Sequence, residues 1–238
     1  MVRLELLVAL CAALAALSCG PAPLADDEST LAKARDRMVA EQIEARGVKD
    51  PLVLAAMRTV PRHEFVPPAA RLDAYGDHPL PIGHGQTVSP PYIVALMTQA
   101  LGLQGGEKVL EVGTGSGYQA AVLARIGASV YSIEIVAPLA EEARERMARL
   151  GYRNVFVRAG DGYKGWPESA PFDAIVVTAA APRVPEPLKD QLRDGGRLVI
   201  PVGEKDQELM VITRRGAGFE ERRVQPVVFV PMTGEVRR

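Results

Sequence analysis

The sequence predicts an α/β fold with a doubly wound, mostly parallel sheet, an N-terminal helical extension and an antiparallel C-terminal edge. From Lys108 onward, short apolar runs alternate with helical patterns, and this alternation requires crossover connections between parallel strands. The first apolar run ends at a turn with three glycines, Gly113, Gly115 and Gly117, and helix formers follow it. The chain has 238 residues, of which 47% are hydrophobic, and this is enough for one full core.

Residues 1–27 are interpreted as a leader and tether. Leu6 to Leu17 form an apolar run preceded by Arg3, long enough for a signal-peptide core and too short to span a bilayer. Ala16-Leu17-Ser18-Cys19 resembles a lipoprotein cleavage box, in which Cys19 would carry the lipid. We therefore expect export to the periplasm or a membrane-anchored form. An overextended start site or a nonfunctional leader is the alternative.

Composition excludes several classes of partner. Both cysteines, Cys11 and Cys19, lie in the leader, so residues 28–238 can form neither an internal disulfide nor a cysteine metal site. The 28 basic and 29 acidic residues nearly balance, and five Phe, six Tyr and one Trp are too few for a stacking platform. We expect no nucleic-acid partner, no metal and a monomeric chain.

Two helices are expected before the sheet. The first is capped by Ser29 or Thr30 and stopped by Gly47, and apolar residues recur along it at helical spacing. The second begins at Asp50, with proline at its first helical position, and ends before Pro61. These helices belong to an N-terminal part, residues 28–104, of a single domain that extends over residues 28–238.

A long loop follows from Tyr75 to Pro91, rich in Gly, Pro and His and without a helical period. Loops of this length inside a compact domain are usually functional or disordered, and its apolar side chains favour order. Ser89 then precedes a helix, and its simplest role is an N-cap with Pro90 as the first helical residue. His63, upstream, is interpreted as a structural loop histidine rather than a catalytic base.

Residues 105–238 carry the sheet. Strands are expected at Lys108–Val112, Ser129–Ile133, Val155–Arg158, Ala174–Thr178 and Arg197–Pro201. Helices are expected between them at Tyr118–Arg125, Pro138–Leu150 and Pro187–Leu192. The tail changes to antiparallel strands that close one edge, at Glu208–Thr213, Phe219–Val224 and Val227–Val230.

The glycine turn indicates the class of cofactor. A dinucleotide site has the spacing Gly-x-Gly-x-x-Gly, but here the third glycine, Gly117, comes one position early. Gly-x-Gly-x-Gly is instead common in Rossmann-like methyltransferases that use S-adenosylmethionine. Gly113, Thr114, Gly115 and Gly117 are expected to bind this cofactor, whose carboxylate can use free backbone N–H groups near the helix N-terminus. Glu111, just inside the turn, could face the ammonium or sulfonium charge.

Acidic residues follow the next two strands. Glu134 comes about 20 residues after the first glycine, where a carboxylate can accept both ribose hydroxyls. Gly160-Asp161-Gly162 follows the next strand and places Asp161 to accept from an adenine amino group. An acid after a strand is usually a solvated loop residue. Three such signals at successive strand ends nevertheless favour S-adenosylmethionine over NAD.

A family resemblance covers nearly everything from Arg37 to the C-terminus. The matching stretches are Arg37-Met38-Val39 with Gln42-Ile43, Val60–Val66, Pro79–Tyr92, Glu111–Ala121, Tyr131–Ile135, Gly151–Pro167, Pro171–Ala180 and Gly196–Gly203. Through them the chain resembles the protein-L-isoaspartate O-methyltransferases. The loop motif Gly85–Ser89 and the run Gly160–Tyr163 are more specific than the glycine turn.

The resemblance implies a reaction and a set of site residues. A methyl group passes from S-adenosylmethionine to the α-carboxylate of an isoaspartyl residue in a damaged protein or peptide, and the ester closes to a succinimide that yields some normal aspartate. Ser89 matches the active-site serine, and we interpret its hydroxyl as a donor that orients the carboxylate. The substrate channel is expected to include His84, Gly85, Thr87, Thr178, Ala179 and Ala180. For His84 and Thr87, hydrogen bonding within the loop is the alternative.

Two features depart from the family. Pro90 stands where the family often has Gln or Ala, and it removes one backbone donor beside the substrate. The leader is also unusual, because family members are mostly cytoplasmic and S-adenosylmethionine is made in the cytoplasm. Two other functions stay open: a methyltransferase for a small-molecule carboxylate or hydroxyl, and a noncatalytic exported binding protein.

Overall fold

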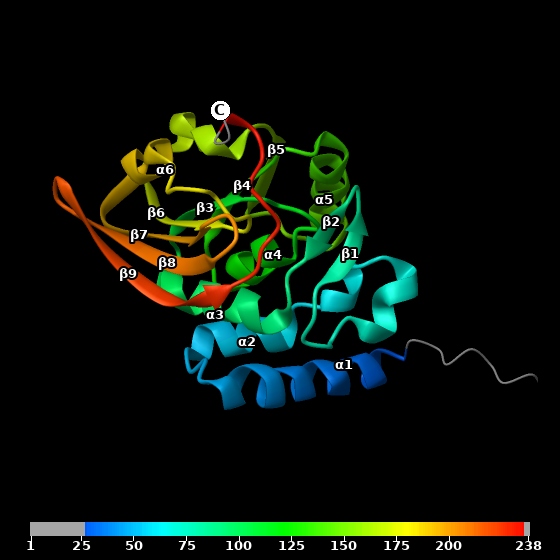
Figure 1. The fold of residues 1–238 in the computed structure, drawn as a ribbon. Coiled ribbons are helices and arrows are strands. Elements are labelled where there is room, and N and C mark those ends of the chain that lie inside the picture. The colour runs from blue at the N-terminus through cyan, green and yellow to red at the C-terminus, as the bar shows by residue number, and fades with distance from the viewer. Residues whose placement is uncertain (1–26, 236–238) are drawn as a thin grey trace, which may run out of the picture.

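The computed structural model describes residues 27–235 (Figure 1). The leader, with Cys19 and its cleavage box, lies outside the described residues. Within 27–235, no helix is both long and apolar enough to cross a membrane.

A seven-stranded sheet forms the centre of the molecule, in the order β5-β4-β3-β6-β7-β8-β9. Its strands are β3 (Lys108–Val112), β4 (Ser129–Glu134), β5 (Val155–Ala159), β6 (Phe172–Val177), β7 (Leu192–Val202), β8 (Gln207–Arg215) and β9 (Gly218–Val227). The first five in spatial order are parallel, and β8 and β9 are antiparallel. The predicted doubly wound sheet with an antiparallel edge is confirmed. Strand order reverses between β3 and β6, the switch point where such sheets bind ligands.

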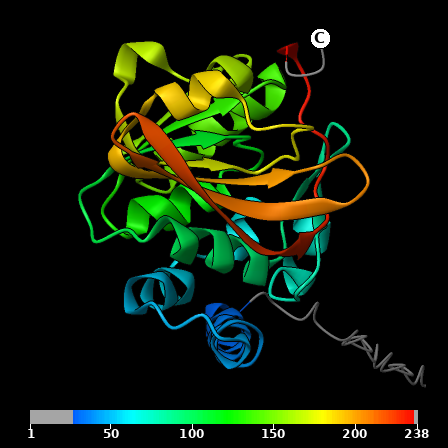
Figure 2. The same cartoon turned by 60° about the vertical axis from the view of Figure 1, so that its left-hand side comes forward.

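Helices cover both faces of the sheet (Figures 1 and 2). They are α3 (Pro91–Leu101), α4 (Tyr118–Arg125), α5 (Ala137–Arg149) and α6 (Glu186–Asp190). Alternate side chains of one strand enter two different cores. Val109 packs with α3, α4 and α5, whereas Leu110 and Val112 pack on the other face with Leu188 of α6.

The N-terminal helices pack beneath this sheet domain (Figure 1). The first begins as α1 (Glu28–Arg37), continues as a π-helical segment (Met38–Ile43) and a 3₁₀ turn (Glu44–Arg46), and ends at Gly47 with φ 93°. The second is α2 (Pro51–Thr59), capped by the Asp50 carboxylate. Both predicted helices are confirmed, but the first is capped by Asp27 rather than by Ser29 or Thr30. The Asp27 carboxylate accepts from the backbone N–H of Ser29, which places Ser29 inside the helix.

The loop before α3 contains a β-hairpin that was not predicted. Strands β1 (Leu80–Gly83) and β2 (Gln86–Val88) pair antiparallel across His84 and Gly85, which both have positive φ, 51° and 71°. Helix α3 begins at Pro91, with Pro90 as its N-cap and no side-chain cap. The predicted N-cap role of Ser89 is therefore wrong. The second proline sets the helix start one residue later, so the Ser89 side chain lies before the cap position.

The C-terminal tail was predicted incorrectly. The expected strand Val227–Val230 does not form, because β9 ends at Val227 and the chain then crosses the strand ends (Figures 1 and 2). Ala180 donates to the Val230 carbonyl at 2.8 Å and accepts from the Met232 N–H at 2.7 Å. Met232 is buried in the core on the α6 face, and this burial draws the tail away from the sheet edge.

Candidate functional site

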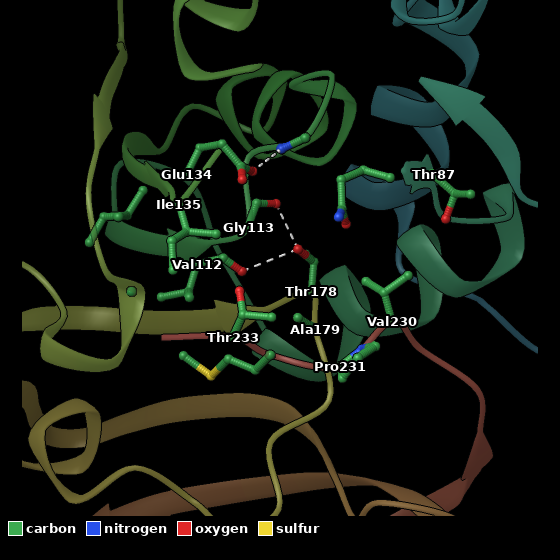
Figure 3. A pocket seen from close by; sticks show the side chains of 15 residues that line it. Thr87, Val112, Gly113, Glu134, Ile135, Thr178, Ala179, Val230, Pro231 and Thr233 are labelled. Carbon is green, nitrogen blue, oxygen red and sulfur yellow. Dashed lines mark hydrogen bonds between the residues drawn. The ribbon is translucent and has the colours of Figure 1, made fainter. Parts of the chain in front are cut away.

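A pocket of about 650 Å³, part of it open to solvent, lies at the carboxyl ends of β3, β4 and β6 (Figure 3). The first pocket, as we call it, is lined by Gln86, Thr87, Val112, Gly113, Gly115, Ile133, Glu134, Ile135, Gly162, Thr178, Ala179, Val230, Pro231, Met232 and Thr233. Six separate segments of the chain therefore meet there.

The glycine turn forms the floor of the first pocket. Gly113, Gly115 and Gly117 have φ of 98°, 52° and 89°, a region that side chains disfavour. A Cβ at Gly113 would lie 2.3 Å from Thr178 Oγ1, so the close approach of β6 also requires glycine. Gly117 is absent from the pocket lining. A Cβ there would lie 2.4 Å from Cε of Met147, so this glycine allows α5 to pack against the turn.

Glu134, at the end of β4, stands beside the turn as predicted. Its Oε2 accepts from the Gly115 N–H at 2.8 Å (Figure 3). Its Oε1 accepts from the Val136 N–H at 2.9 Å. Each carboxylate oxygen has two lone pairs and can accept a further hydrogen bond from a ligand. Glu134 thus both fixes the turn and offers paired acceptors to the pocket.

Glu111 lies beneath the turn rather than on the pocket wall. It is fully buried and accepts a hydrogen bond from the Ser132 hydroxyl, which in turn lies 2.5 Å from Thr114 Oγ1. Burial raises the pKa of Glu111 to about 8, and the charge of Glu134 acts in the same direction. The structure therefore does not place Glu111 facing a ligand. Thr114 lines a second pocket.

Asp161 also lies off the pocket lining, although its neighbour Gly162 is part of it. The Asp161 carboxylate caps a short 3₁₀ turn by accepting from the Tyr163 N–H at 3.0 Å. Its other oxygen accepts from the N–H of Glu235 in the tail at 2.8 Å. A Cβ at Gly162 would lie 2.2 Å from Val112, which is why the chain has glycine there.

The second pocket, of about 400 Å³, adjoins the first and contains Ser89. It is lined by Thr87, Val88, Ser89, Val94, Met97, Gly113, Thr114, Gly115, Ser116, Tyr118, Gln119 and Thr178. Thr87, Gly113, Gly115 and Thr178 line both pockets. Among residues 27–235 the Ser89 hydroxyl has no hydrogen-bond partner, so it is available to a ligand.

The predicted channel residues separate into two groups. Thr87, Thr178 and Ala179 line the pockets, and Thr87 lies across the first pocket from Glu134 (Figure 3). Thr178 donates to the carbonyls of Val112 and Gly113 at 3.1 and 2.6 Å, so its hydroxyl holds the turn. The others lie outside both linings: His84 and Gly85 form the exposed hairpin turn, and buried Ala180 pairs with the tail.

His63 lines neither of the two pockets, in agreement with its interpretation as structural. It is buried, and its Nδ1 lies 2.7 Å from the Tyr75 hydroxyl. Burial lowers its pKa from the ordinary histidine value. In the part of the chain that the structure describes, no group of three or more His, Cys, Asp or Glu side chains could hold a metal ion.

Sequence reasoning missed two sets of lining residues. The first is the tail segment Val230–Thr233, which covers one side of the first pocket (Figure 3). The sequence signal that could have identified this segment is an apolar run interrupted by Pro231 and ended by Gly234. This composition is unlike that of a central strand. The second set is Ser116 and Gln119, which line the second pocket although the sequence predicts for them only positions in the glycine turn and the following helix.

Comparisons with known proteins agree on one family. The model of the protein-L-isoaspartate(D-aspartate) O-methyltransferase family matches residues 33–237. Protein-L-isoaspartate O-methyltransferases from Gloeobacter violaceus and Methylorubrum extorquens are 58% and 59% identical over 200 and 203 residues. The alignments cover 83% and 84% of this chain and 98% and 89% of those proteins.

Solved structures give the same result. A protein-L-isoaspartate O-methyltransferase structure matches with a TM-score of 0.77 and 31% identity, covering 85% of this chain and 67% of that one. A Plasmodium falciparum structure assigned to the same enzyme type, in complex with S-adenosyl-L-homocysteine, matches with a TM-score of 0.72 and 28% identity. That match covers 84% of this chain and 98% of the other.

Proposed function

The chain belongs to the protein-L-isoaspartate(D-aspartate) O-methyltransferase family, and we propose that it methylates the α-carboxylate of L-isoaspartyl residues in damaged proteins and peptides. The observation that carries this proposal is the pair of adjoining pockets. The first has the glycine turn and Glu134, and the second has the free hydroxyl of Ser89. The methyl ester then closes to a succinimide, whose hydrolysis returns some normal aspartate.

The first pocket fits S-adenosyl-L-methionine. Glu134 offers paired acceptors that match the two ribose hydroxyls, and Gly162 and Ile135 leave an open, partly apolar wall for the adenine. Gly113 and Gly115 bring bare backbone to the pocket where a side chain would fill it. When bound, the cofactor supplies a methyl group on a positively charged sulfur. Asp161 is proposed to act indirectly, because its carboxylate accepts from the N–H groups of Tyr163 and Glu235 and so holds the turn after Gly162 and the tail.

Ser89 is proposed to orient the acceptor carboxylate by donating its hydroxyl hydrogen. An α-carboxylate has an ordinary pKa of about 3.5 and is ionised at neutral pH, so no strong general base is required. The protein must instead hold one carboxylate oxygen in line with the methyl group and keep water away. Thr87 and Thr178 line both pockets and therefore lie where the two reactants would meet.

A pair of peptides tests this function. The full chain is incubated with labelled S-adenosyl-L-methionine and either an isoaspartyl peptide or its aspartyl twin of identical sequence. We expect labelling of the isoaspartyl peptide at a rate at least about tenfold higher, since the two differ only in the position of the carboxylate. Equal rates would favour a methyltransferase of broader carboxylate specificity. Absence of cofactor binding would favour the noncatalytic alternative.

We also infer that residues 1–27 act as an export leader, with Cys19 as the site of a lipid anchor. The inference is supported by the apolar run Leu6–Leu17 and by the cleavage-box sequence that ends at Cys19. Mass spectrometry of the native N-terminus tests it. We expect a lipidated Cys19 in the membrane fraction, and an unmodified Met1 on cytoplasmic protein would contradict it.

We further propose that the chain acts as a monomer, because both pockets are formed within one chain. Light scattering of the full chain should give a mass near 25.6 kDa. Twice that mass would contradict the proposal.

A further inference from the structure

Gln119 lines the second pocket with an unused acceptor. It lies in the first turn of α4 and is only 6% exposed. Its Nε2 donates to Thr98 Oγ1 at 2.8 Å, but within residues 27–235 its Oε1 has no partner. Buried polar atoms in native proteins are nearly always bonded, and one without a partner beside a pocket indicates a ligand.

Thr98 fixes which end of the amide is free. Its hydroxyl donates to the Val94 carbonyl at 2.7 Å, so its single hydrogen is already used. Thr98 Oγ1 can therefore only accept, and the Gln119 group that faces it must be the NH₂. The reverse orientation of the amide would place two acceptors together. The free end of Gln119 is thus an oxygen.

A second buried polar atom in the same pocket also lacks a hydrogen-bond partner among the described residues. Ser116 is 4% exposed, and its Oγ has no hydrogen-bond partner in the described part of the chain. The lining of the second pocket contains no Asp, Glu, Lys or Arg. A cation bound there would therefore be held by neutral acceptors, of which Gln119 Oε1 and Ser116 Oγ are the two buried and unused ones.

We propose that Gln119, held in place by Thr98, binds the α-ammonium group of the methyl donor. This inference rests on the proposed function and adds a residue that determines cofactor affinity. The second pocket adjoins the first pocket, where the nucleoside is proposed to bind, at Gly113 and Gly115. The amino-acid end of the donor can therefore extend into the second pocket. An ammonium group has three N–H donors and matches both unused acceptors. A backbone amide of the peptide substrate has one N–H and would leave one of them unpaired.

Two ligands and one substitution test the inference. Gln119→Met keeps the volume of the side chain and removes the amide, while Thr98 remains bonded to Val94. Calorimetry on the full chain compares S-adenosyl-L-homocysteine with 5′-methylthioadenosine, which lacks the amino-acid end. We expect the Kd for S-adenosyl-L-homocysteine to rise about 10- to 100-fold, as for loss of a charged hydrogen bond. The Kd for 5′-methylthioadenosine should change less than about threefold.

Thr98→Val is the companion variant to Gln119→Met, and it tests whether Thr98 positions the Gln119 amide. It removes the hydroxyl that orients the amide and should raise the Kd for S-adenosyl-L-homocysteine by a smaller factor, again without changing that for 5′-methylthioadenosine. Equal weakening of both ligands by Gln119→Met would show a structural role and overturn the inference. Unchanged affinities with a raised KM for the isoaspartyl peptide would assign Gln119 to the substrate and overturn it too. Failure of the wild-type chain to bind either ligand would refute the proposed function itself.

Discussion

At the scale of single residues, Ser89 depends on the two prolines that follow it. Pro91 occupies the first helical position and Pro90 the cap, so the Ser89 hydroxyl is not used to cap α3. In the sequence, a serine before a proline reads equally well as a cap or as a ligand group. The register of the helix start, which the sequence does not specify to one residue, decides between these roles.

Ser89→Ala tests the role of the hydroxyl. We expect kcat with an isoaspartyl peptide to fall about 10- to 100-fold, because a hydrogen bond to the reacting carboxylate is lost. Affinity for S-adenosyl-L-homocysteine should stay within about twofold, because the Ser89 hydroxyl is proposed to bind the carboxylate of the peptide and not the cofactor. Steady-state kinetics and calorimetry measure both quantities. A loss of cofactor affinity with unchanged kcat would mean that Ser89 supports the loop instead.

Glu134 and Glu111 show what spacing predicts and what it misses. Glu134 lies at the pocket because it ends its strand, and its position about 20 residues after the first glycine predicts this location together with the other strand-end signals. Glu111 lies within β3, so the alternation of the strand decides where its side chain points. It shares parity with Val109, which packs on the α4 face, and this places Glu111 under the turn. The alternation of side-chain direction along β3 therefore predicts that Glu111 faces the helices and not the pocket.

At the scale of elements, Glu111 joins β3, β4 and the glycine turn. The links are Ser132 on β4 and Thr114 in the turn, and all three side chains are buried. Burial holds the pKa of Glu111 at about 8, against an ordinary value of 4.5. Between these values the folded chain binds one proton more than the unfolded chain. Its free energy of unfolding therefore decreases as pH rises through that window.

Glu111→Gln should remove this pH dependence. Relative to the variant, the wild type is expected to lose up to roughly 5 kcal/mol of stability between pH 4.5 and pH 8, at about 1.4 kcal/mol per pKa unit. Urea unfolding at several pH values measures the difference. Glu145→Gln, on the exposed side of α5, is the control and should follow the wild type. Parallel pH curves for wild type and Glu111→Gln would contradict a protonated Glu111.

The regular elements of the sheet domain were predictable, whereas the two segments that cover the pockets were not. Hydrophobic runs and glycine stops define the parallel strands and their helices. The β1–β2 hairpin turns at His84-Gly85, which lacks the usual Asn-Gly signal. The tail is apolar like a strand, but among residues 228–235 only Met232 is buried, and it packs with residues distant in sequence. The local sequence pattern does not predict such long-range contacts.

At the scale of the whole molecule, the site is an assembly of distant segments. The hairpin, the glycine turn, the ends of β4 and β6 and the C-terminal tail meet at the switch point of the sheet (Figures 1 and 3). The parallel topology explains the motif residues, because parallel strands end at one edge. Burial of Met232 brings the tail to the same edge, where it lines the first pocket and the Glu235 N–H donates to Asp161. Fold and cofactor class therefore follow from sequence, and closure of the site follows from packing.

The central claim concerns which oxygen receives the methyl group. The most direct measurement follows an isoaspartyl peptide over time with the full chain and S-adenosyl-L-methionine, by mass spectrometry after chromatographic separation of the isoaspartyl and aspartyl forms. We predict gain of one methyl group, loss of methanol as the succinimide forms, and accumulation of the aspartyl peptide. A stable methylated peptide that never yields the succinimide or the aspartyl form would contradict the account.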